Sequence, residues 1–273
     1  MVVVGPHVCP EYPSYHTPCL SSLAPAAHNV SIGARLATQP DSVRVKVAGL
    51  RDLTWSITHG ARGQGAMGDT EFSTLVQLLQ HRAHHQPDRC AYTVLAENGS
   101  AEVSVTYRQL ERQAQAIAAR LQGLNAAGER VLLLYTTSME YITSFFGCLY
   151  AGAVAVPAYP LRSLRPHPRN QAIAQDAQAT VALTKTSTLP VLQQRVERVP
   201  EMKGLRCLGT SYPEPDEDAD RWQPPTIRAD TIAYLQYTSG STASPKGVVL
   251  SHQNLLHNLA QIREAFRLGE EEV

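Results

Sequence analysis

The chain has 273 residues, of which 43% are hydrophobic and 18% charged, a composition typical of a soluble globular protein with one large or two medium domains. Lys and Arg together number 24, as do Asp and Glu, so there is no excess positive charge to attract nucleic acid or an anionic membrane. No segment is long and apolar enough for an ordinary membrane span. The five scattered cysteines form no Cys-x-x-Cys pair, which argues against a disulfide framework or zinc knuckle and favours a cytoplasmic protein.

Residues 1–66 differ in character from the rest of the chain. They hold six prolines, and only residues 43–47 alternate with the period of a strand. We interpret this segment as a disordered or non-native leader, with Met67 as a credible true start; a docking arm is the alternative. The folded part is therefore assigned to residues 67–273, with regular structure from Phe72.

Two helices and a hairpin are predicted next. Apolar residues recur at helical spacing before Pro87, and two strand-like runs then flank Asn98-Gly99, a dipeptide suited to a tight turn. Thr106 and Gln109 form a capping-box pattern that starts the second helix. The expected segments are a helix at residues 75–83, strands at 91–95 and 103–105, and a helix from residue 106 to the glycines at 123–128.

Short apolar runs and amphipathic segments alternate over the following residues. Continuous apolar strands separated by helices are typical of parallel β-α-β units that are covered on both faces. The sequence therefore predicts an α/β fold built on a parallel sheet. The expected strands are residues 131–135, 153–156 and 180–183, the expected helices are residues 139–150, 170–177 and 188–199, and a further apolar run covers residues 205–208.

Residues 212–225 interrupt this alternation with four prolines and five acidic side chains. Acidic runs are usually solvated, and no glycine-turned calcium loop is present, so we interpret the segment as a solvated surface loop rather than a metal site. The acidic residues are Glu214, Asp216, Glu217, Asp218 and Asp220.

Residues 238–246 lie between expected strands at residues 232–237 and 247–250, and they include five hydroxyl side chains, one glycine, one proline and a single cation. Hydroxyls and free backbone N–H groups donate to phosphate oxygens, and lysine adds a compact positive charge. Five residues separate Gly240 from Lys246, which differs from the spacing of the common P-loop. On composition alone, a polyphosphate-binding loop and a flexible loop between strands are equally open.

The string from Tyr237 to Val248 reads Tyr-Thr-Ser-Gly-Ser-Thr-x-x-Pro-Lys-Gly-Val and is followed by Ser251-His252-x-Asn254. It resembles the AMP-binding signature of the adenylate-forming superfamily, which includes acyl-CoA synthetases, fatty-acyl-AMP ligases and peptide-synthetase adenylation domains. A match of this length is highly specific.

Residues 147–160 also resemble a stretch seen in fatty-acyl-AMP ligases, and the resemblance as a whole runs from about Phe72 to the end of the chain. Ala243 stands where the superfamily most often has glycine, a position that varies among fatty-acyl-AMP ligases. The resemblance implies that residues 67–273 form part of an AMP-binding N-terminal domain, a parallel-sheet α/β fold that is incomplete at its C-terminus.

The resemblance implies ATP and Mg²⁺ as cofactors and a two-step ligase reaction. A fatty acid or related carboxylic acid attacks the α-phosphorus of ATP, and the thiol of coenzyme A or an acyl carrier protein then displaces AMP. Charge builds on the departing pyrophosphate, so nearby donors and cations lower the barrier. Lys246 and Thr242 are the expected catalytic residues. The expected cofactor-binding residues are Thr238, Ser239, Gly240, Ser241, Thr242, Lys246 and Gly247.

No protein ligand for a metal is assigned, because in the superfamily the magnesium ligand, the adenine and ribose contacts and the C-terminal lysine come later than the residue matching Val273. We therefore expect a truncated form of the ligase with an exposed apolar sheet edge. The alternative is a non-catalytic remnant that binds nucleotide or a partner protein.

Two sets of histidines have competing interpretations. His252 could orient a substrate carboxylate or pack beside the adenylate, or it could be a capping neighbour at the start of a helix. The cluster of His81, His84 and His85 has too few companions for a metal site, and we expect an exposed helix end there.

Overall fold

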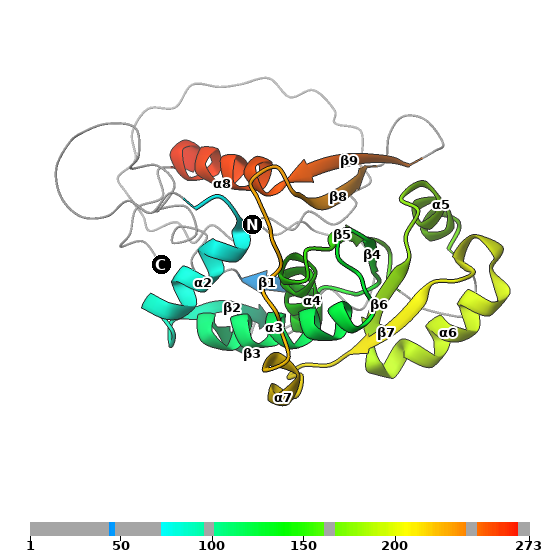
Figure 1. The fold of residues 1–273 in the computed structure, drawn as a ribbon, viewed down its shortest axis with the longest axis horizontal. Helices are drawn as coiled ribbons and strands as arrows, with labels where there is room; N and C mark the ends of the chain where they lie inside the picture. The colour runs from blue at the N-terminus through cyan, green and yellow to red at the C-terminus, as the bar shows by residue number, and fades with distance from the viewer. Residues whose placement is uncertain (1–43, 47–71, 96–100, 161–166, 239–244, 267–273) are drawn as a thin grey trace, which may run out of the picture.

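The computed structural model describes residues 44–46, 72–95, 101–160, 167–238 and 245–266, and their strands form two sheets (Figure 1). The smaller sheet is antiparallel and has the order β1-β2-β3. Its strands are β1 (Arg44–Lys46), β2 (Cys90–Leu95) and β3 (Ala101–Thr106). The predicted hairpin is confirmed, although its Asn98-Gly99 turn lies outside the described residues. β1 corresponds to the strand-like run in the leader, and it pairs with β2.

The first two predicted helices are confirmed as α2 (Leu75–His85) and α3 (Tyr107–Gly123). The Thr106 hydroxyl accepts from the backbone N–H of Gln109, and the Gln109 side chain accepts from the N–H of Thr106. This reciprocal capping box satisfies two N–H groups that have no partner inside the helix. The start of α3 is therefore fixed by four residues of local sequence.

The larger sheet has the order β7-β6-β4-β5-β8-β9, with β9 antiparallel to β8 and all other neighbours parallel. This arrangement confirms the predicted α/β fold. Its strands are β4 (Arg130–Leu133), β5 (Val154–Pro157), β6 (Val181–Lys185), β7 (Arg206–Thr210), β8 (Ile232–Thr238) and β9 (Lys246–Ser251).

Helices cover both faces of the larger sheet, which explains why its central strands are apolar throughout. On β4, Val131 and Leu133 join the core cluster that contains residues of α2, α3, α4 and α8, whereas Leu132 lies in the second cluster, with α5 and α6. The helices are α4 (Met139–Tyr150), α5 (Pro168–Asp176), α6 (Leu189–Arg198) and α8 (His252–Phe266), with short turns η1 (Thr186–Thr188) and η2 (Pro200–Met202) beside α6.

The prediction that the acidic segment is wholly solvated is wrong for Glu214. Its side chain is 3% exposed and pairs with Arg120 of α3 at 2.7 Å. The backbone N–H of Ser211 also donates to Glu214 Oε1 at 2.6 Å. A buried carboxylate requires such partners, and here α3 supplies the charge. The next residues form the short helix α7 (Asp216–Ala219).

An apolar edge is exposed at β9, as expected from the sequence. Val248 and Val249 are 46% and 57% exposed. β9 is the last strand of the larger sheet, so one side of its backbone has no neighbouring strand in the described part of the chain.

Candidate functional site

The β8–β9 hairpin brings together the two ends of the hydroxyl-rich segment. Thr238 ends β8, Lys246 begins β9, and the two residues are cross-strand partners with exposed side chains. Cross-strand partners in an antiparallel pair have Cα atoms about 5 Å apart. The side chains that carry the Thr238 hydroxyl and the Lys246 ammonium group therefore start from neighbouring backbone positions. The predicted strand on each side of the segment is thus confirmed.

Four of the predicted cofactor-binding residues fall within residues 239–244, outside the described residues. Their phosphate contacts, and the catalytic role of Thr242, stay predictions. These four residues are Ser239, Gly240, Ser241 and Thr242.

The hairpin tip projects from the edge of the larger sheet where open α/β folds bind ligands. The carboxyl ends of β4, β5 and β8 lie at one edge because the three strands are parallel. The helix that follows β4 belongs to one core cluster, and the helix that follows β5 belongs to the other. Such a change of direction opens a crevice between strand ends, which is the usual ligand site of these sheets. Thr238 ends the strand next to β5.

Gly247 makes room for the ring of Tyr237, its cross-strand partner. A Cβ atom added at Gly247 would lie 2.9 Å from Cζ of Tyr237, closer than real side chains approach. Tyr237 is 7% exposed, and its hydroxyl donates to Oδ2 of Asp176 at 2.5 Å. Burial, together with the hydrogen bond and charge of Asp176, raises the pKa of Tyr237, so the hydroxyl keeps its proton at neutral pH. Sequence reasoning missed Asp176, which lies 61 residues before Tyr237.

The segment that follows β5 is fixed to α5 by one buried amide. The Asn170 side chain accepts from the backbone N–H of Tyr159 and donates to its carbonyl oxygen, both at 2.9 Å. The Tyr159 ring stacks on His167 and lies 5.7 Å from the Arg169 guanidinium. The start of α5 is therefore held at the carboxyl end of β5.

His252 has a structural role in this chain. It is 1% exposed, and its Nδ1 atom accepts from the backbone N–H of Leu75 at 3.2 Å, at the start of α2. Burial lowers the pKa of His252 to about 4, so the imidazole is neutral at physiological pH and can accept this bond. Because the ring is enclosed and its Nδ1 is occupied, orientation of a substrate is the weaker of the two interpretations.

The rest of the Ser251-His252-x-Asn254 string also starts a helix. The Asn254 side chain accepts from the backbone N–H of Ser251 at 3.0 Å, and the Ser251 hydroxyl accepts from the N–H of Asn254 at 3.2 Å. This reciprocal pair is the capping-box arrangement at the start of α8.

The described residues hold no group of three or more His, Cys, Asp or Glu side chains that could bind a metal ion. His81 and His85 stack with their ring centroids 4.0 Å apart, and His84 and His85 lie at the exposed end of α2. Nor is any helix in this part of the chain both long and apolar enough to cross a bilayer.

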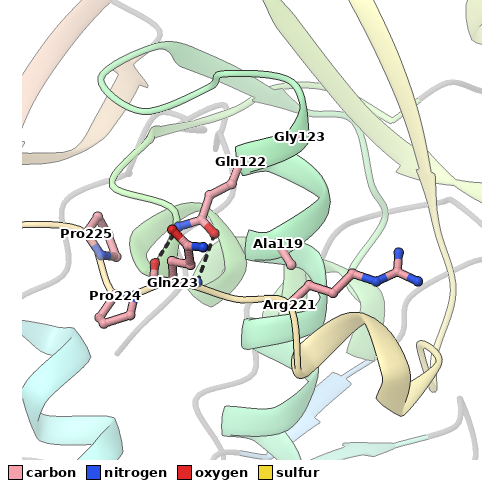
Figure 2. A pocket seen from close by; sticks show the side chains of 7 residues that line it. All are labelled: Ala119, Gln122, Gly123, Arg221, Gln223, Pro224 and Pro225. Atoms are coloured by element: carbon pink, nitrogen blue, oxygen red, sulfur yellow. Dashed lines mark hydrogen bonds between the residues drawn. The ribbon is translucent and has the colours of Figure 1, made fainter.

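A surface cleft of about 460 Å³ lies between α3 and residues 221–225 (Figure 2). Gln122 donates to the backbone carbonyl of Gln223 and accepts from its N–H, while the Arg221 side chain extends away from this pair. None of the predicted site residues lines the cleft. The segment leads from α7, which Figure 1 shows on the opposite side of the molecule from the β8–β9 hairpin.

Comparison with known proteins places the fold and the hairpin in one family. Residues 79–273 match the AMP-binding enzyme family. The medium-chain-fatty-acid–[acyl-carrier-protein] ligase JamA of Moorena producens is 47% identical over 205 residues, which are 73% of this chain and 34% of JamA. The long-chain-fatty-acid–AMP ligase FadD32 of Mycolicibacterium smegmatis is 34% identical over 73% of this chain and 32% of its own length. The chain thus spans about a third of these relatives.

A solved structure agrees with these relatives. The fatty acyl-adenylate ligase from L. pneumophila, in complex with acyl adenylate and pyrophosphate, superposes with a TM-score of 0.65 and 35% identity. The superposition covers 73% of this chain and 34% of that protein. With a family match over most of its length and a hairpin of the expected form, the chain belongs to the AMP-binding enzymes.

Proposed function

We propose that this chain is part of an ATP-dependent ligase that activates a fatty acid or related carboxylic acid as its acyl adenylate. The observation that carries the proposal is the pairing of Thr238 with Lys246 at the carboxyl edge of the sheet, beside β5. The names of JamA, FadD32 and the ligase from L. pneumophila support the same chemistry. Because the chain spans about a third of these relatives, the complete reaction is proposed for the whole protein.

The proposed first step joins a substrate carboxylate oxygen to the α-phosphorus of ATP and breaks the bond to pyrophosphate. Negative charge grows on the departing pyrophosphate as that bond lengthens. The Lys246 ammonium and the Thr238 hydroxyl would stabilise this charge, with hydroxyl and backbone donors from Ser239, Ser241 and Thr242. The thiol that then displaces AMP would belong to an acyl carrier protein, as the name of JamA indicates for that protein, or to coenzyme A.

Magnesium enters this proposal as part of the substrate MgATP. Among the described residues there is no group of three or more His, Cys, Asp or Glu side chains that could bind a metal ion. Mg²⁺ commonly binds through substrate phosphates and retains several waters, so few protein ligands are needed. The role of the chain is therefore to hold the phosphates that carry the ion.

We also propose domain bounds and a cellular location for the protein. We assign residues 67–273 to the partial AMP-binding domain and residues 1–66 to a leader; the family match itself begins at residue 79. The scattered cysteines support a cytoplasmic location. The second candidate is a non-catalytic remnant that binds nucleotide or a partner protein.

Fatty-acid-dependent exchange of pyrophosphate into ATP separates the two candidates. Exchange by this chain would exclude the remnant. Silence both from this chain and from a form extended with downstream sequence would exclude the ligase. Nucleotide binding without exchange by either form would favour the remnant.

Lys246→Ala tests the phosphate site within that assay. We expect exchange to fall by about 10²-fold to 10³-fold, the cost of one lost donor to developing charge. Lys246 is exposed, so unfolding free energy should change by no more than about 0.5 kcal/mol. Lys203→Ala, at an exposed lysine after η2, is the matched control and should leave exchange unchanged. If Lys246→Ala loses activity and its melting temperature falls in parallel, the loss reflects unfolding, which would contradict the assignment.

A further inference from the structure

The outer half of the β8–β9 hairpin has few attachments to the sheet. β8 pairs with β5 at one position, where Tyr234 lies opposite Ala155. β9 pairs with β8 and has no other strand beside it in the described part of the chain. The hairpin therefore extends beyond the parallel ladder, and its tip carries Thr238 and Lys246.

One side-chain hydrogen bond ties this outer half to another element. Among the described residues, the bond from the Tyr237 hydroxyl to Asp176 is the one side-chain hydrogen bond that joins residues 236–238 or 246–249 to the rest of the fold. The 2.5 Å separation is typical of a hydroxyl donating to a carboxylate, a pairing about twice as strong as a neutral one. Tyr237 also packs into the second core cluster, so its ring has little freedom.

Asp176 is itself held in place by the sheet. It ends α5, and the next residue, Ala177, accepts a hydrogen bond at 3.0 Å from Nε of Arg130 in β4. Asn170 fixes the other end of the helix to Tyr159. A carboxylate at a helix C-terminus is electrostatically unfavourable, and the Tyr237 hydroxyl offsets that cost by donating to it.

Gly247 keeps the Tyr237 ring in line with its acceptor. Because an added Cβ would lie 2.9 Å from Cζ and 3.1 Å from the hydroxyl oxygen of Tyr237, any larger residue would push the ring away from Asp176. Tyr237, Asp176 and Gly247 thus act together, and Tyr237 and Gly247 immediately adjoin Thr238 and Lys246.

We propose that Tyr237 is a positioning residue whose bond to Asp176 sets the tilt of the hairpin, and so the place where Thr238 and Lys246 meet the phosphates of the nucleotide. The phosphate contact rests on the proposed function; the hold on the hairpin does not. Tyr237 itself touches no substrate in this account.

The hold on the hairpin is tested by amide hydrogen exchange in the 273-residue chain without ligand. We expect the amides of β9 to exchange at least about tenfold faster in Tyr237→Phe and Asp176→Ala, since a hydrogen bond to a charged group is lost. Asp176→Asn should exchange faster than the parent chain but more slowly than Asp176→Ala, because its amide oxygen can accept the bond only as a weaker, neutral acceptor. Tyr234→Phe is the matched control, the same change on the same strand but against the other core cluster. Unchanged β9 exchange in Tyr237→Phe would overturn the proposal.

The consequence for phosphate binding is tested by titrating MgATP into the same variants. We expect weaker binding in Tyr237→Phe, about tenfold in Kd, a smaller loss in Asp176→Asn, which keeps a neutral acceptor, and no change in Tyr234→Phe. Faster exchange with an unaltered Kd in Tyr237→Phe would overturn the positioning role and leave a purely structural bond. If neither the parent chain nor a form extended with downstream sequence binds MgATP, the proposed function fails, and the exchange result alone decides whether Tyr237 holds the hairpin.

Discussion

The core beneath α4 and the tip of the β8–β9 hairpin differ in how each is held. Phe145 of α4 is 2% exposed, and its ring contacts those of Phe146 and Tyr234. Several side chains of the core therefore hold it in place. Thr238 and Lys246 at the hairpin tip are exposed, and in the described part of the chain one side-chain hydrogen bond, from the neighbouring Tyr237, ties this end of the hairpin to the rest of the fold. The contrast separates the packed core, which we expect to carry stability, from the hairpin tip, where we propose the chemistry. Changes in the core should affect unfolding, and changes at the tip should affect ligands.

The largest effect on stability is expected from Phe145→Ala. Removal of a buried aromatic ring leaves a cavity and should reduce the free energy of unfolding by about 3–5 kcal/mol, measured by urea denaturation. Val249→Ala, on the exposed β9 edge, is the counterpart in the hairpin and should cost no more than about 0.5 kcal/mol. Similar costs at the two positions would break the distinction between core and hairpin.

His252 gives the core a dependence on pH. Its pKa is 6.5 in the reference state and about 4 in the fold because of burial. Below pH 6.5 the unfolded chain binds a proton that the folded chain does not, so stability falls as the pH drops from 6.5 to 4. A shift of this size corresponds to about 3 kcal/mol.

His252→Asn should reduce this dependence, because the amide can still accept from Leu75 but does not titrate. Urea midpoints at pH 7.5 and pH 4.5 in the two chains measure the difference. If both chains lose the same stability between these pH values, His252 is not the group responsible.

A smaller effect of opposite sign is expected at Glu111 of α3. Burial raises the pKa of Glu111 from 4.5 to about 6, so its full contribution is present below pH 4.5 and is lost as the pH rises through 6. Glu111→Gln should therefore stabilise the chain at pH 7.5 by about 1 kcal/mol, after allowance for solvent screening of a partly exposed group. The gain should be absent at pH 4, and a gain that persists there would point to a cause other than ionisation.

Local signals in the sequence predicted most of the fold. The capping box of Thr106 and Gln109 needs four consecutive residues, and the apolar runs of β4 to β6 reflect burial on both faces. Contacts between distant residues were not predictable in this way. Glu214 is buried against Arg120, which lies 94 residues away in sequence. Likewise, nothing in the sequence near Asp176 indicates that it accepts a hydrogen bond from Tyr237.

The candidate site was predicted from a string of residues, and the structure supplies part of its geometry. Thr238, Lys246 and Gly247 meet at the top of one hairpin, and Gly247 has a packing reason to be glycine as well as the predicted contact with phosphate. His252, in the same string, belongs to the core. A motif of this kind therefore mixes residues that would touch a ligand with residues that hold the hairpin and helix in place.

The most direct test of phosphate binding at the hairpin is a titration of the isotopically labelled chain with MgATP, followed by backbone amide NMR. The account predicts that the largest shifts occur within residues 238–247, Thr238, Lys246 and Gly247 among them, with little change around Gln122 and Gln223 at the distant cleft. Saturable shifts confined to that cleft, with the hairpin amides unmoved, would contradict it.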